Sequence, residues 1–198
     1  LNCCCFHDIF LSVFTEDSMR KIQFILGILA AASSSATLAY DGTIDFSGQV
    51  VAQTCSVEAD STHLVVILPT VSTASLTSPG DVAGLTPFAI VLEGCSTDVT
   101  GVGTKVYAFF EPNADTDNET HNLNIKSNSN SAKNVQIQLM NADGTSPIYL
   151  GTQGNQGQTP VVIDKDTMQL WYNAQYYATG QATAGNVSAT VNYTIAYQ

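Results

Sequence analysis

The sequence predicts an all-β protein, folded as a β-sandwich. Short runs rich in valine, isoleucine and aromatic residues alternate with polar residues at period two, which places every second side chain on one face of a strand. Gly, Pro, Asn and Asp separate these runs at short intervals, as turns do in sandwiches and barrels. Helical periodicity is confined to one apolar segment near the N-terminus, and no linker or internal repeat divides the rest of the chain.

The N-terminal region has the pattern of an export signal. Arg20 and Lys21 precede an apolar run at 22–32 and a run of small residues at 33–39. The sequence therefore predicts a signal peptide at 19–39, cleaved after Ala39 or, as the alternative, after Ala36. The apolar run is shorter than the roughly 20 residues that span a bilayer. Residues 1–18, with three adjacent cysteines, are interpreted as an upstream artefact rather than as a metal or lipid site.

The strands are predicted from alternation and from the residues that end each run. In chain order the predicted strands are 49–57, 63–68, 86–92, 105–111, 134–140, 161–163, 168–177 and 188–197. Pro69 and Pro112 end two of them, and a turn is predicted at 141–144, where the sequence reads Asn-Ala-Asp-Gly. No element is predicted for 72–85 beyond a short helical turn.

Charge and cysteines limit the class of protein. The formal net charge is −11 with only six Lys and Arg residues, which argues against nucleic acid and anionic membrane surfaces as partners. Only Cys55 and Cys95 follow the predicted signal peptide, and an exported pair of this kind predicts a disulfide. Closing this loop would contribute on the order of 4 kcal/mol. Two separate buried thiols are the alternative.

The sequence offers no set of residues for catalysis. His63 and His121 have no cysteine or second histidine at the spacing of zinc ligands, and no serine lies in a G-x-S-x-G motif. Residues 113–119 carry oxygen ligands at alternate positions but lack the glycine of a calcium loop, so we interpret them as a solvated acidic loop. No enzyme activity, metal or cofactor is predicted.

Both ends of the expected exported chain, 40–198, alternate in the manner of strands. Near its start, Gly42, Ile44, Phe46 and Gly48 fall on one side. Near the C-terminus the apolar set is Val187, Ala189, Val191, Tyr193, Ile195 and Tyr197. From alternation alone, the segment at 42–48 is equally an ordinary strand of the chain's own sheet or an edge segment that pairs with another molecule.

Several motifs together resemble the pilin subunits of bacterial chaperone–usher fimbriae, especially type 1-like major subunits. The motifs, in order, are Gly-Thr-Ile-Asp-Phe-Ser-Gly at 42–48, Val50-Val51, Cys55, Pro-Phe-Ala-Ile at 87–90, Cys95, Tyr-Tyr-Ala-Thr-Gly at 176–180 and Tyr-Thr-Ile-Ala-Tyr-Gln at 193–198. A penultimate aromatic residue, here Tyr197, and a glycine fourteen residues from the end, here Gly185, form the C-terminal signature of that family.

The resemblance implies an immunoglobulin-like β-sandwich that lacks its final strand. Residues 49–198 would form the pilin domain, and residues 40–48 would form an arm that completes a neighbouring subunit by donor-strand complementation. The implied donor residues are Gly42, Ile44, Phe46 and Gly48. The implied groove for chaperone or donor strand is lined by Gly185, Val191, Tyr193, Ile195 and Tyr197.

The implied function is that of a structural subunit of a surface fimbria that supports adhesion. Its partners would be other fimbrial subunits, a periplasmic chaperone and an outer-membrane usher, with a host receptor as a further candidate and without nucleic acid. The protein would pass through the periplasm to the cell surface. The alternative is a minor adapter or adhesive subunit with its own receptor-binding surface.

Overall fold

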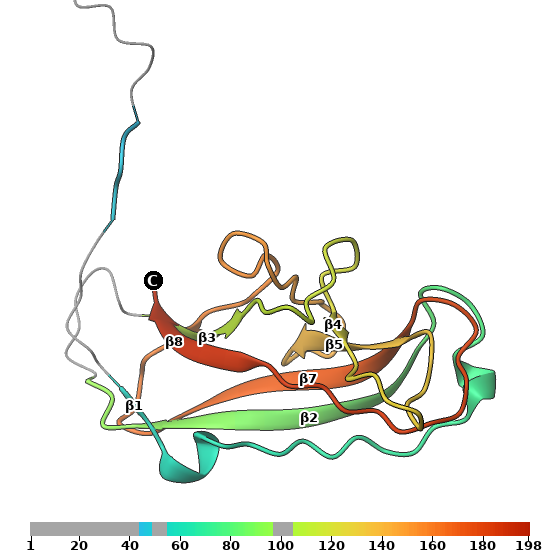
Figure 1. The fold of residues 1–198 in the computed structure, drawn as a ribbon. Coiled ribbons are helices and arrows are strands. Elements are labelled where there is room, and N and C mark those ends of the chain that lie inside the picture. The colour runs from blue at the N-terminus through green and yellow to red at the C-terminus, as the bar shows by residue number, and fades with distance from the viewer. Residues whose placement is uncertain (1–43, 49–54, 97–104) are drawn as a thin grey trace, which may run out of the picture. The chain divides into compact units, whose positions relative to one another are not determined.

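The computed structural model describes residues 44–48, 55–96 and 105–198 (Figure 1). The predicted signal peptide, Gly42 and most of the strand predicted at 49–57 lie outside these residues. The chain divides into two units, 1–48 and 49–198. In the first unit, the described residues 44–48 are exposed and have no regular secondary structure. Among the described residues no helix has the length and apolar character needed to cross a membrane.

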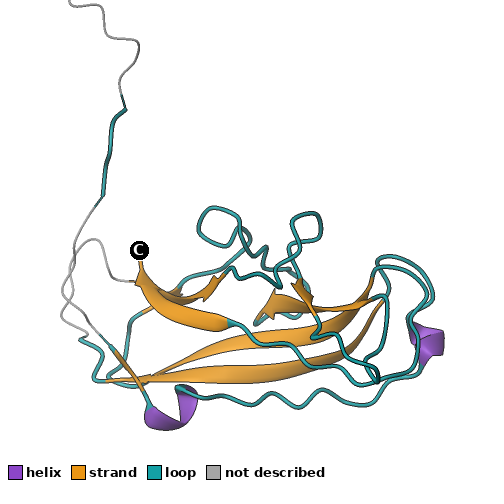
Figure 2. Cartoon of the chain, in the orientation of Figure 1, coloured by secondary structure: helices purple, strands orange, loops and turns teal. Residues whose placement is uncertain are grey.

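The second unit is a sandwich of two antiparallel sheets (Figure 2). Its elements are β1 (Ser56–Val57), the 3₁₀ turns η2 (Ala59–Ser61) and η3 (Thr73–Ser75), β2 (Val82–Glu93), β3 (Lys105–Glu111), β4 (Leu123–Asn124), β5 (Val135–Asn141), β6 (Val161–Val162), β7 (Met168–Ala178) and β8 (Asn192–Tyr197). One sheet has the order β1-β2-β7-β5-β4 and the other the order β6-β3-β8. The predicted all-β sandwich is therefore confirmed.

The strongest alternating runs form the strands as predicted. β3 has the predicted bounds, and β5 and β7 end one residue beyond them. β2 begins earlier than predicted because Gly84, at φ +72°, allows the backbone irregularity at which its pairing with β7 changes register between Ala83 and Thr86. The turn predicted after β5 is held by Asp143, whose carboxylate accepts hydrogen bonds from Ser146 and Thr145 and whose pKa is thereby lowered to about 2.

Other parts of the chain differ from the prediction. Residues 63–68 form no strand, and no strand of the described residues pairs with them; Figure 2 draws this segment as loop. The short helical turn predicted within 72–85 is η3, but the same segment also contains the first residues of β2, and the two-residue strand β4 was not predicted. The terminal strand begins at Asn192 rather than 188, and among the described residues no strand pairs with 188–191.

The core fills the space between the two sheets. Phe110 of β3 and Tyr172 of β7 meet edge to face at its centre, with ring centroids 5.1 Å apart. The fully buried large side chains around them come from both sheets and from the segment between β5 and β6: Ile90, Leu92, Val106, Leu123, Ile148, Leu150 and Leu170. The groove described next opens directly onto this core.

Candidate acceptor groove

An apolar groove of about 960 Å³ runs between two segments of the sandwich, 62–68 and 187–193. Its floor is formed by core side chains from both sheets: Phe88, Ile90, Phe110, Leu123, Ile137, Leu139, Ala174 and Tyr176. In a complete sandwich a strand would cover such side chains. The groove therefore lies where one strand of the sandwich is missing.

The first rim of the groove, residues 62–68, presents apolar side chains to solvent. Leu64, Val65 and Ile67 are exposed by 41, 73 and 83%. Among the described residues, the backbone groups of 63–71 take part in no hydrogen bond. Exposed valine and isoleucine on a backbone without partners among the described residues are the features of an open sheet edge.

The second rim, residues 187–193, is paired on one side only. Lys126 N donates to Ser188 O at 2.7 Å, and Asn113 Nδ2 donates to Thr190 O at 3.1 Å. These two hydrogen bonds are formed at the backbone edge of the rim that is turned away from the groove. Val187, Ala189 and Val191, which alternate with Ser188 and Thr190, are half-buried and line the groove.

β8 continues the second rim as an edge strand. Gln198 and Lys105 exchange two backbone hydrogen bonds, at 2.9 and 3.0 Å. In an antiparallel ladder hydrogen-bonded pairs alternate with non-bonded ones, so Tyr193, Ile195 and Tyr197 turn their backbone groups away from β3. Within the part of the chain that the structure describes, no strand pairs with the groove-facing backbone edge of either rim.

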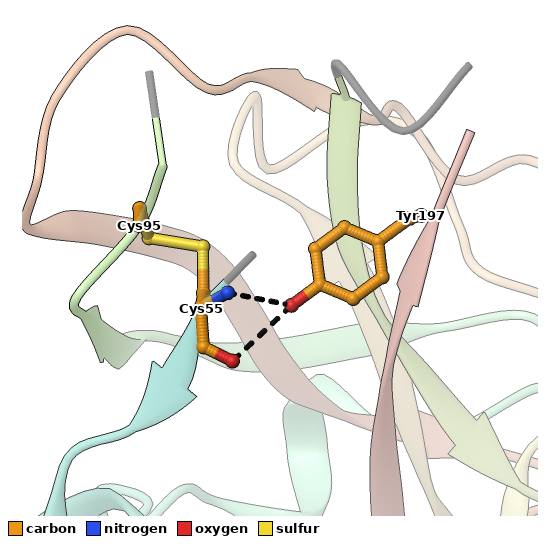
Figure 3. The surroundings of a disulfide bond; sticks show 3 residues. All are labelled: Cys55, Cys95 and Tyr197. Carbon is orange, nitrogen blue, oxygen red and sulfur yellow. Dashed lines mark hydrogen bonds between the residues drawn. A yellow bond between two sulfur atoms is a disulfide. The ribbon is translucent and has the colours of Figure 1, made fainter. Parts of the chain in front are cut away.

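Two tyrosines of β8 close one end of the sandwich. The Tyr193 hydroxyl donates to Ser61 O at 2.6 Å, and burial raises the pKa of this tyrosine. The Tyr197 hydroxyl accepts a hydrogen bond from Cys55 N at 3.1 Å and donates to Cys55 O at 3.3 Å (Figure 3). Cys55 is joined to Cys95 by the predicted disulfide. The end of β8 is therefore tied to the disulfide-linked segments.

Gly185 positions the beginning of the second rim. A Cβ at this residue would overlap with the backbone of Ser131 and Ala132. The close approach permits Ala132 N to donate to Asn186 O at 3.0 Å and Asn186 N to donate to Asn130 O at 2.7 Å. Glycine is required here because the two backbones lie in contact.

The structure places the predicted groove residues at three sites. Val191 and Tyr193 line the groove. Ile195 and Tyr197 lie farther along β8, packed against the core cluster, and Gly185 lies before the rim. Residues 62–68 were not predicted to form a rim, although the uninterrupted apolar run at 64–68 was a signal. In the first unit, the predicted donor residues Ile44 and Phe46 are exposed by 77 and 91%.

The acidic loop and the histidines have structural contacts. In the loop at 113–119, Asp117 accepts hydrogen bonds from Thr120 N and Glu119 N, which lowers its pKa. His121 Nδ1 lies 3.0 Å from Leu150 O, and His63 lies on the first rim. Within the part of the chain that the structure describes, no three His, Cys, Asp or Glu residues gather into a metal site.

A solved structure shares this architecture. The P pilus rod subunit PapA superposes with a TM-score of 0.56 over 74% of this chain and 100% of its own, at 17% identity. Likeness at this identity concerns the fold. The sandwich is the immunoglobulin-like fold of chaperone–usher pilins.

The sequence matches identify the family. The family described as "FimA: Type-1 fimbrial protein, A" matches residues 68–198. The F17 fimbrial protein of Escherichia coli is 61% identical over 181 residues, which cover 91% of this chain and 100% of that protein. A major fimbrial subunit of Haemophilus influenzae is 37% identical, over 85% of this chain and 92% of its own. The chain belongs to the type-1 fimbrial protein family, as the sequence motifs predicted, and is a fimbrial subunit of the chaperone–usher type.

Proposed function

We propose that this chain polymerises into the shaft of a surface fimbria by donor-strand exchange, with the arm at 40–48 of one copy filling the groove of another. The observation that carries the proposal is the groove itself, whose apolar floor lies between two rims that no strand of the described residues pairs with on the groove side. An inserted strand would form backbone hydrogen bonds with both rims and cover the exposed core, which is β-strand addition.

The arm matches the groove in length and in pattern. The motif 42–48 and the rims 62–68 and 187–193 each have seven residues, which span roughly 23 Å when extended. Ile44 and Phe46 fall on one face of an extended arm, so both can enter the groove together. Gly42 and Gly48 flank them on the same face, where the absence of a side chain permits close approach.

Apolar burial supplies the driving force. Ile44 and Phe46 are exposed in the isolated chain, and burying two side chains of this size is worth roughly 3–6 kcal/mol. Ordering the arm reduces that gain, whereas backbone pairing with both rims adds to it. An open edge of this kind also promotes aggregation, which supports a periplasmic chaperone as an earlier occupant of the groove.

The route and partners follow from this scheme. The signal peptide at 19–39 would direct export, the chaperone would deliver the subunit to an outer-membrane usher, and the partner in the fibre would be another copy of this chain. The role is structural rather than enzymatic. The fibre would carry the protein to the cell surface and support adhesion there.

Deleting Tyr40–Ser47 tests the proposal. The shortened subunit keeps its groove, so it should still be recovered with the chaperone from periplasmic extracts. It should be unable to add to the subunit before it, and electron microscopy of cells that express it as their only copy should show no fibres. Fibres of normal length from the deleted chain would refute donor-strand exchange through this arm.

A point variant in the same arm is the matched control. Asp45 alternates with Ile44 and Phe46, so its side chain would face away from the groove. Asp45→Asn should assemble normally, whereas Ile44→Asn together with Phe46→Asn should abolish fibres and keep chaperone binding. Equal loss in all three variants would indicate that the arm acts in export rather than in pairing.

A further inference from the structure

The second edge of the β3–β8 pair is closed by side chains. Along β3, alternate residues turn their backbone groups away from β8; the first of these, Val106, is paired with Val161 of β6. Among the described residues no strand lies beside the next two, Ala108 and Phe110, yet all four of their backbone groups are hydrogen-bonded. This edge differs in that respect from the open edge at the groove.

Asn155 forms two of these four hydrogen bonds. Phe110 N donates to Asn155 Oδ1 at 2.6 Å, and Asn155 Nδ2 donates to Phe110 O at 3.0 Å. One fully buried side-chain amide thus gives Phe110 the two hydrogen bonds that a neighbouring strand would give. Gln158 Nε2 donates to Ala108 O at 2.7 Å, and Ala108 N donates to the Tyr172 hydroxyl at 2.9 Å.

The side-chain amide of Gln158 is oriented so that its nitrogen, rather than its oxygen, faces Ala108. Its Oε1 is buried and has no hydrogen-bond partner among the described residues. The opposite orientation would set Oε1 against the carbonyl oxygen of Ala108, two acceptors facing each other. An unsatisfied buried oxygen is costly. The unsatisfied Gln158 oxygen is thus the consequence of using the amide nitrogen to hydrogen-bond the Ala108 carbonyl.

The loop that carries Asn155 is built to hold it. Asn155 has φ +48°, the left-handed region that asparagine tolerates, and its N–H donates to Thr152 O at 3.1 Å. Thr152 Oγ1 donates to Tyr149 O at 2.6 Å and accepts from Gln156 N at 2.7 Å. Asn141 Nδ2 fixes the far end by donating to Gly157 O at 2.7 Å. The amide is therefore pre-positioned.

We propose that Asn155, assisted by Gln158, blocks strand addition at the edge of β3 that faces away from β8, so that the β3–β8 pair accepts a strand only on its groove side. The consequence for assembly rests on the proposed polymerisation. A β3–β8 pair open on both sides could accept a strand at each and form branched or irregular aggregates. Closing the β3 side favours addition of the arm at the groove and therefore a linear fibre.

Asn155→Gly is the test variant, because glycine keeps the left-handed backbone and removes only the side chain. Asn134→Gly is its matched control: Asn134 also has a positive φ, +58°, but it is exposed and bonds Gln181 O away from this edge. The rate of amide hydrogen exchange at Phe110 measures how well this edge of β3 is protected, independently of the groove. Exchange should be at least about tenfold faster in Asn155→Gly than in Asn134→Gly, after scaling to global stability.

Sedimentation of the variants measures whether opening the β3 edge causes self-association. With a synthetic peptide of residues 40–48 filling the groove, the full chain and Asn134→Gly should sediment as monomers, whereas Asn155→Gly should form larger species. If Asn155→Gly does not fold, Gln158→Ala opens the neighbouring carbonyl and should associate under the same conditions. Monomeric behaviour of the folded variants would overturn the proposal, as would unchanged exchange at Phe110. Failure of the peptide to bind the unaltered chain would instead refute the proposed function, and exchange at Phe110 would still decide the role of Asn155.

Discussion

Single hydroxyl groups decide how the ends of the sandwich are joined. The Tyr197 hydroxyl bonds both backbone groups of Cys55, and the Tyr193 hydroxyl bonds Ser61. Both contacts link β8 to residues more than a hundred positions earlier. They explain in physical terms why an aromatic residue with a hydroxyl stands next to the last position.

Tyr197→Phe should destabilise the protein by about 1–2 kcal/mol, because it removes two hydrogen bonds at a buried backbone segment and keeps the ring. Urea unfolding monitored by fluorescence measures the change in the free energy of unfolding. Tyr177→Phe is the control, since the Tyr177 hydroxyl forms no hydrogen bond within the described ranges, and its effect should stay within about 0.5 kcal/mol. Equal effects of the two substitutions would contradict the role of the Tyr197 hydroxyl.

At the scale of elements, alternation predicts strands well where a partner strand lies in the same chain. β3, β5 and β7 follow their patterns almost to the residue. Residues 63–68 contain the β-branched run Val65-Val66-Ile67, yet no strand of the described residues pairs with them. A local pattern reports the tendency to pair, whereas pairing itself depends on what lies alongside.

The closed edge of β3 could not be predicted from the sequence. Asn155 lies in a Gly-rich loop whose pattern indicates turns alone, and its partner Phe110 is 45 residues away. The resemblance to pilins predicted a groove near the terminal strand, but the first rim and the role of Gly185 depend on tertiary contacts. Such contacts leave no local signal in a single sequence.

Gly185→Ala tests how the second rim is positioned. The added methyl group would overlap with the backbone of Ser131 and Ala132, so the rim must shift, and we expect a loss of about 1–3 kcal/mol. The control is Gly180→Ala, whose added methyl group would meet Asn134 at an ordinary 3.5 Å. Urea unfolding midpoints compare the two variants. A Gly185→Ala protein as stable as Gly180→Ala would show that the rim tolerates displacement.

On the scale of the whole molecule, Tyr172 joins the two sheets. It stands on β7, packs edge to face on Phe110 of the opposite sheet, and accepts a hydrogen bond from Ala108 N of β3. Burial raises the pKa of its hydroxyl to about 12. Ionising this group is therefore less favourable in the folded than in the unfolded protein, which couples one proton to the stability of the fold.

This coupling predicts the response of stability to alkali. The neutral hydroxyl is favoured in the folded state, so its contribution is complete below the unfolded pKa of about 10 and is lost as pH rises toward 12, at up to about 1.4 kcal/mol per pH unit. Urea unfolding between pH 8 and 11.5 should show a plateau followed by this decline. Tyr172→Phe should be less stable at pH 8, because Ala108 N loses its acceptor, and its decline above pH 10 should be shallower. Parallel declines in both proteins would locate the alkaline sensitivity elsewhere, for example at Tyr176 and Tyr193, whose pKa values burial also raises.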